Sequence, residues 1–149
     1  MLGQLSETEI EDLLKSQYVG RVGCYSGGVT YVVPVNYFYD GNCIYSHAGE
    51  GTKIRMMREN PEVCFEVDRI ETIVSWQCVI TWGRFEEITG FEEKQQVMQR
   101  LTNRVMPLIT NDNGHPSHGI TAAASDVGDI VELVLYKINL KTKTGRFEK

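Results

Sequence analysis

The sequence lacks several features that would place it in a functional class at once. No apolar run approaches the length of about 20 residues that a membrane-spanning helix needs. The 149 residues include 15 Lys and Arg against 20 Asp and Glu, a net charge of −5, and the basic residues form no cluster. This balance argues against a nucleic-acid-binding protein. The first residues lack the basic and apolar regions of a signal peptide, so we expect a cytoplasmic protein.

Cysteine is scarce, and its spacing is not that of a metal site. The four residues are Cys24, Cys43, Cys64 and Cys78, and no two of them form a C-x-x-C pair. This spacing argues against structural zinc. Without an export signal we expect no disulfides either. Each cysteine lies in an apolar, strand-like context, where it is expected to act as a small buried hydrophobic residue.

The apolar periodicity predicts a mainly β protein with peripheral helices, built as a six- to seven-stranded antiparallel barrel. Residues 1–149 are expected to form a single domain, since 149 residues with 42% hydrophobic content suit one core. A three-strand meander opens the sheet. The expected strands are 19–25, 29–39, 42–47, 62–68, 75–88 and 129–140. A short first helix starts at Ser6 and is ended by Gly20 and the change of period, and further helices are expected at 53–59 and 90–106, with a long loop at 110–129 and a polar tail at 141–149.

Three local signals support these boundaries. Ser6 and Glu9 have the spacing of a helix capping box, in which each side chain bonds the other's backbone. Thr52 is expected to cap the second helix. Gly83 interrupts the strand at 75–88 and predicts a bulge or bend.

The strand at 29–39 contains a residue type that strands ordinarily exclude. Pro34 lies in its middle, although proline cannot donate to a strand ladder, and Asn36 follows two residues later. Local rules are broken most often at functional or strained positions. The alternative is structural, with Pro34 on a protected edge and Asn36 bonded to the backbone. After the strand, Asp40-Gly41 predicts a hairpin turn.

The segment "SHAGEGTK" at 46–53 combines a strand end, two glycines and a helix start. A helix N-terminus presents free N–H groups and favours phosphate. Lys53 is placed against the helix dipole, and an anionic ligand would resolve that conflict. Arg55 and Arg58 either assist or are merely solvated. The GxxxxGK[ST] spacing of a P-loop is missing.

Histidine is the remaining candidate for proton chemistry. His47 lies where the strand meets the helix start, and it is either a structural hydrogen-bonding group or part of a site. His115 and His118 lie in the long loop without other metal-ligating residues nearby in the sequence, and we expect them to face solvent.

Four motifs occur in order between residues 18 and 90: "YVVPVN", "IYSHAGEGTK", "NPEVCFEVD" and "WQCVITWGR". Together they resemble the FMN-binding split-barrel family related to pyridoxamine 5′-phosphate oxidase. Within that family they resemble the branch that includes the 5-nitroimidazole-resistance (Nim-like) proteins.

The resemblance implies a split β-barrel homodimer with FMN at the subunit interface. It places the phosphate on Lys53 and the ring against the strand around Pro34. Cys78 stands where relatives carry a polar residue near the flavin. Trp76 and Trp82 could stack on a ligand, although barrel core is expected for at least one of them. The cofactor-binding residues implied are Val33, Pro34, Val35, Asn36, Tyr37, Ser46, His47, Gly51, Thr52, Lys53 and Cys78.

The function that follows is an FMN-dependent oxidoreductase acting on a small organic substrate, with reduction of nitroimidazole-type compounds as the activity of the resembling branch. His47 is the candidate catalytic residue, transferring a proton or holding an anionic substrate. The sequence does not decide between FMN and a deazaflavin, although an acidic chain with one lysine corner suits the smaller, singly phosphorylated ligand. A non-catalytic flavin or haem carrier, with histidine as the iron ligand, is the alternative. A regulatory domain without cofactor is a third possibility.

Overall fold

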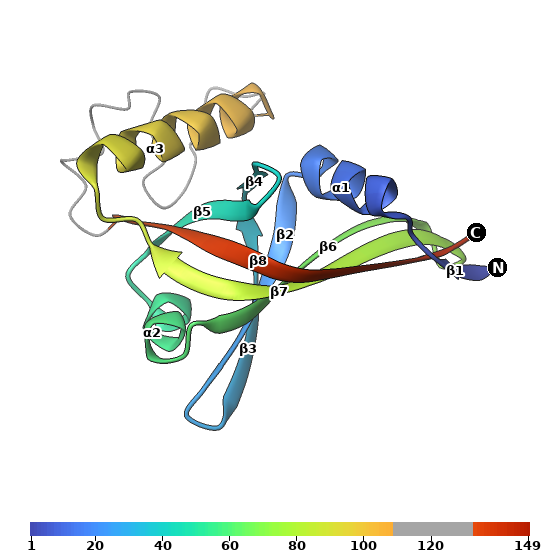
Figure 1. Cartoon of the computed structure of the whole chain (residues 1–149), viewed down its shortest axis with the longest axis horizontal. Coiled ribbons are helices and arrows are strands. Elements are labelled where there is room, and N and C mark those ends of the chain that lie inside the picture. Colours follow the sequence, from blue (N-terminus) through green and yellow to red (C-terminus); the bar gives the residue numbers. More distant parts are fainter. Residues whose placement is uncertain (109–132) are drawn as a thin grey trace.

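The computed structural model describes residues 1–108 and 133–149. Its eight strands form one antiparallel sheet in the order β3-β2-β6-β7-β8-β5-β4, and β1 pairs with β8 (Figure 1). Three helices surround the sheet within these residues, which confirms the predicted fold class. The strands are β1 (Leu2–Gln4), β2 (Val19–Ser26), β3 (Val29–Asn36), β4 (Phe38–Tyr39), β5 (Cys43–Gly49), β6 (Glu62–Thr72), β7 (Ser75–Glu87) and β8 (Leu133–Glu148), and the helices are α1 (Glu7–Ser16), α2 (Thr52–Glu59) and α3 (Phe91–Val105).

The sheet is split rather than closed. β3 and β4 end the strand order at opposite edges, yet they are consecutive in the chain and only Tyr37 separates them. The prediction of one strand over 29–39, and of a three-strand meander, is therefore wrong. The Tyr37 N–H still donates to the Tyr18 carbonyl, at 3.3 Å, which extends the β2–β3 register by one residue. The chain then passes to β4, where Phe38 pairs with Tyr45 of β5. This break, together with β1, raises the strand count to eight.

The helix starts follow the sequence in one case and depart from it in another. Ser6 Oγ accepts from the Glu9 N–H at 3.2 Å, and the Ser6 N–H donates to the Glu9 carboxylate at 2.7 Å, so the capping box is confirmed. The prediction that Thr52 caps α2 is wrong. Thr52 is the first helical residue, Gly51 occupies the cap position, and no side chain bonds the free N–H groups there.

The last strand is longer than its apolar pattern indicates. β8 continues through the segment expected to be a polar tail and ends at Glu148, because β7 pairs with it from Trp76 onward. The pairing register shifts between Trp82 and Gly83, which confirms the bulge. The predicted loop at 110–129 and the first residues of the strand at 129–140 lie outside the described residues.

Two apolar clusters hold the structure together. One fills the barrel, and the other lies between α3 and the outer face of β5 and β8. Trp76 is partly buried and Trp82 is 45% exposed, so neither tryptophan belongs to the core and that prediction is wrong. Among the described helices, none has the length and apolar character needed to cross a bilayer.

Gly20 is required where β2 approaches β6. A Cβ at this position would lie 2.1 Å from Phe65 Cζ and 2.9 Å from the Glu66 carbonyl oxygen. We expect Gly20→Ala to lower the free energy of unfolding by about 1–3 kcal/mol through overpacking. Chemical denaturation measures this. Gly49→Ala is the control, because its Cβ would meet no atom within 4 Å. Equal stability of the two variants would contradict this account of the packing.

Candidate functional site

A pocket lies at the split between the two sheet edges. It has a volume of about 340 Å³, within the range usual for small-molecule sites. The base of the β2–β3 hairpin forms one wall, and the end of β5 and the first turn of α2 form the other. Its lining residues are Val19, Val33, Pro34, Val35, Asn36, His47 and Lys53.

The β3 wall explains the proline. β3 pairs with β2 alone, with Pro34 opposite Arg21, so it is an edge strand. An edge strand tolerates proline, since one side of its backbone has no ladder to complete. The structural and functional interpretations of Pro34 thus describe the same position. The unpaired edge of β3 forms a wall of the pocket.

Side-chain hydrogen bonds replace the missing ladder across the split. Ser46 Oγ, on β5, donates to the Asn36 carbonyl on β3 at 2.6 Å. The Tyr37 hydroxyl donates to the Leu14 carbonyl, also at 2.6 Å, and burial raises the pKa of Tyr37. The Ser46 bond joins β5 to β3 without closing the pocket between them, and the Tyr37 bond ties the strand break to α1.

Arg104 fixes the same junction from α3. Its Nε donates to the Tyr37 carbonyl at 3.1 Å, and its Nη2 donates to the Lys15 carbonyl at 2.8 Å and to the Gln17 carbonyl. The guanidinium also lies 4.4 Å from the centre of the Tyr18 ring. A single cation therefore ties the end of α1 and the strand break to α3.

Lys53 is the cation of the pocket. It is half-buried in the first turn of α2, and burial lowers its pKa. Its ammonium forms no hydrogen bond or ion pair with any other residue that the structure describes. The first turn of α2 contains no acidic residue, and its N-terminal N–H groups have no side-chain cap. A partly desolvated ammonium beside uncapped helix N–H groups favours an anion.

The structure brings together Val33, Pro34, Val35, Asn36, His47 and Lys53 among the residues implied as cofactor-binding. His47 is 7% exposed and lies opposite Leu135 in the β5–β8 pair. Gly51 and Thr52 are exposed beside Lys53 and border a separate shallow depression along α2. His115 and His118 lie outside the described residues.

The other implied residues lie elsewhere. Tyr37 is buried with its ring packed edge-on against Phe65, and Ser46 faces the carbonyl of Asn36. Cys78 lies on β7, outside the pocket, where its Sγ donates to Glu66 Oε1 at 3.4 Å. These residues support the pocket or the sheet and do not line it.

Val19 lines the pocket although the sequence motifs did not point to it. It is opposite Asn36 in the β2–β3 pair. The tight turn at Ser26-Gly27-Gly28 sets that register, so the position could have been found by counting back from the turn.

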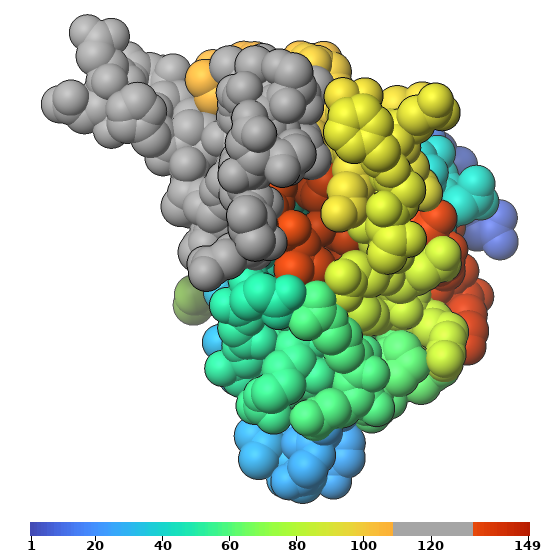
Figure 2. Space-filling model, turned by 90° about the vertical axis from the view of Figure 1, so that its left-hand side faces the viewer, coloured from blue at the N-terminus to red at the C-terminus, as the bar shows by residue number. Residues whose placement is uncertain are grey.

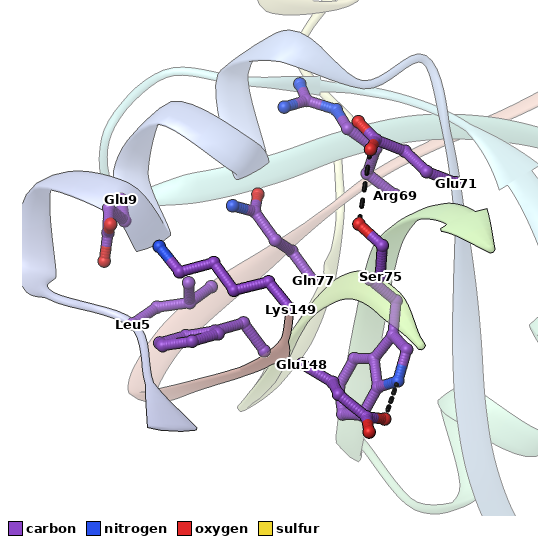
Figure 3. A pocket seen from close by; sticks show the side chains of 10 residues that line it. Leu5, Glu9, Arg69, Glu71, Ser75, Gln77, Glu148 and Lys149 are labelled. Atoms are coloured by element: carbon purple, nitrogen blue, oxygen red, sulfur yellow. Dashed lines mark hydrogen bonds between the residues drawn. The ribbon is translucent and has the colours of Figure 1, made fainter. Parts of the chain in front are cut away.

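Another cavity, of about 210 Å³, lies at the opposite end of the barrel beside both termini (Figure 3). Its polar groups bond one another. Trp76 Nε1 donates to Glu148 at 3.0 Å, and Ser75 Oγ donates to Glu71 at 3.3 Å. The described residues contain no cluster of His, Cys, Asp and Glu suited to a metal ion. The pocket at the split is therefore the candidate site.

The family model described as pyridoxamine 5′-phosphate oxidase matches residues 6–146. The chain belongs to this family. A curated relative, an uncharacterized protein of Rhizobium meliloti (strain 1021), is 29% identical over 84 residues. That match covers 56% of each chain, so it spans only about half the length of the relative.

Solved structures of similar proteins confirm the split-barrel fold. A FAD-binding protein from Mesorhizobium loti has a TM-score of 0.79 and 27% identity, covering 100% of this chain and 99% of its own. A protein from Bacteroides thetaiotaomicron assigned to 5-nitroimidazole antibiotic resistance has a TM-score of 0.72 and 23% identity, covering 99% and 87%. The predicted family is thus confirmed, and the structure from Bacteroides thetaiotaomicron shows the same fold.

The environment of Cys78 predicts low thiol reactivity. Burial, and then the charge of Glu66, raise the pKa of this thiol from 9.0 to about 12. We expect Cys78 to resist iodoacetamide at pH 8 in the folded protein and to react after denaturation, since the thiolate is the nucleophile. Peptide mass spectrometry measures the modification. Rapid alkylation of native Cys78 would contradict the assigned environment.

Proposed function

We propose that this member of the family binds FMN at the split, with the phosphate at Lys53. The observation that carries the proposal is the half-buried Lys53 ammonium, which has no anionic partner among the described residues. It lies in the first turn of α2, where uncapped N–H groups add to the positive potential. A phosphate would compensate the ammonium and accept hydrogen bonds from that turn.

The rest of the pocket suits a flat ring. Val33 and Val35 offer apolar contact beside the edge of β3. Backbone groups on the unpaired side of that strand are available to hydrogen-bond the polar edge of an isoalloxazine. Asn36 is held by the bond from Ser46 to its carbonyl, which leaves its side-chain amide to contact a ligand.

The proposed activity is oxidoreduction of a small organic molecule, with nitroimidazole-type compounds as the first class to test. A bound flavin supplies electron transfer, while the protein binds and orients it. His47 lines the pocket on β5 and could hold or deliver a proton to the substrate. The described residues offer no competing catalytic metal cluster, and a reductant from solution must reload the flavin.

We further propose a homodimer formed through the outer face of the barrel. Val32, Gly23, Cys64 and Trp82 lie in register across four neighbouring strands. Val32 is 62% exposed and Trp82 is 45% exposed. Such an apolar row is unusual on a monomer. It runs beside Pro34, so a second copy seated there would cover the pocket from outside.

Lys53→Gln tests the phosphate site. Fluorescence titration should show that the wild type binds FMN more tightly than riboflavin. The variant should lose about tenfold or more in FMN affinity, because hydrogen bonds to charged groups contribute about 1.5–3 kcal/mol. Its riboflavin affinity should hardly change.

Lys141→Gln is the matched control, since Lys141 is exposed and paired with Glu62 on the surface. FAD is titrated in parallel, because it is the flavin that the description of the Mesorhizobium loti protein names. A wild type that retains no flavin, or a Lys53→Gln variant that still prefers FMN, would refute the proposal. A Soret band in the purified protein would favour the haem alternative.

Trp82→Glu tests the dimer. We expect sedimentation equilibrium to give a dimer mass for the wild type and a smaller mass for the variant, because a carboxylate would be desolvated in the interface. Ile73→Glu is the control, since Ile73 is 92% exposed at the β6–β7 turn and lies outside the row. An unchanged dimer in Trp82→Glu, or a monomeric wild type, would contradict this interface.

A further inference from the structure

A three-residue ion network joins the turn before α2 to the rest of the barrel. Arg58, in the last turn of α2, donates through Nη1 and Nη2 to the two carboxylate oxygens of Glu50 at 2.8 and 2.9 Å. Its Nε donates to Glu87 Oε1 at 2.7 Å. Glu50 lies in the turn, and Glu87 ends β7. Figure 2 shows α2 (green) at the surface beside the end of β7 (yellow-green).

The hydrogen-bond geometry of this network is more favourable than that of an isolated surface ion pair. Isolated exposed ion pairs contribute little, but a bidentate arginine within a network is the recognised exception. The bond from Arg58 lowers the pKa of Glu50, and the bonds from Glu87 and Glu50 raise the pKa of Arg58. Glu50 and Arg58 therefore stay charged at neutral pH. The Arg58 donors are directed at protein carboxylates, so we no longer expect Arg58 to assist a phosphate directly.

The turn at 49–51 is held at its two ends by β5 and α2. Glu50 stands between Gly49 and Gly51, and it is the one residue of the three with a side chain. Gly49 pairs with Leu133 of β8, and the Gly51 carbonyl accepts from the Arg55 N–H at 3.0 Å. No described side chain packs where a Cβ at either glycine would lie. The Glu50 carboxylate thus anchors a turn that directly precedes Lys53 and the free N–H groups of α2.

We propose that Glu50 and Arg58 are positioning residues for the anion site, resting on the proposed function. By fixing the turn at 49–51, they hold the first turn of α2 and Lys53 in the geometry that receives a phosphate. They touch no part of the pocket that would contact the flavin ring. Their contribution is therefore to phosphate affinity alone.

The sign of one substitution separates this role from simple electrostatics. Glu50 is an anion close to the proposed anion site, so removal of its charge should strengthen phosphate binding if charge alone mattered. If Glu50 instead anchors the turn, the substitution Glu50→Gln should weaken phosphate binding.

The test titrates FMN and riboflavin into the full-length wild type, Glu50→Gln, Arg58→Lys and Glu59→Gln. Glu50→Gln should lower FMN affinity about three- to tenfold and leave riboflavin affinity unchanged. Arg58→Lys keeps its charge but loses the bidentate fork, and it should act in the same direction. Glu59→Gln removes a carboxylate from the same helix outside the network and should cause no loss. Glu59 is the partner of Arg55, with the two charged groups 3.6 Å apart.

The outcomes separate the two proposals. If Glu50→Gln and Arg58→Lys bind FMN as tightly as the wild type or more tightly, the positioning role is overturned while the phosphate site stands. If the wild type shows no preference for FMN over riboflavin, the phosphate site itself is refuted. Unchanged riboflavin affinity reports that each variant has kept its fold.

Discussion

The passage of the chain from one edge of the sheet to the other at Tyr37 is the constraint on which the rest of the structure depends. β3 and β4 are continuous in sequence but belong to opposite edges, so no ladder can join them. The junction is held instead by side chains, notably Arg104 on the Tyr37 carbonyl and Ser46 on the Asn36 carbonyl. Because the edges are held close without pairing, a ligand-sized pocket remains between them.

The chemistry of the pocket comes from where α2 begins. Its first turn carries Lys53 without a carboxylate or a side-chain cap, which is unfavourable for an isolated helix. The opposite end carries Arg58, which reaches back to Glu50. The helix thus presents to the pocket a cation that has no partner among residues 1–108 and 133–149, and its other end binds the turn in front of it. This division of roles is difficult to explain by stability alone and fits an anion-binding corner.

Local signals were sufficient for much of the fold and the site. Ser6 with Glu9 and the bulge at Gly83 rest on short-range chemistry that the sequence displays. That Pro34 and Lys53 line one pocket was implied by the family resemblance. The break at Tyr37 could not be predicted, because alternation continues through it and the next pairing, of Phe38 with Tyr45, lies at the opposite edge of the sheet. The length of β8 depends on its partner β7, and polar residues there pair as well as apolar ones. Cys78 lies outside the pocket because of where the fold places β7, and no local sequence pattern indicates that position.

The most direct test of the account is a crystal structure of the protein with FMN. The account predicts density for the phosphate within hydrogen-bond distance of Lys53 Nζ and for the ring against Pro34 and Val35. Flavin bound in the cavity beside the two termini, or a phosphate with no contact to Lys53, would contradict the claim that the split between β3 and β5 is the functional site.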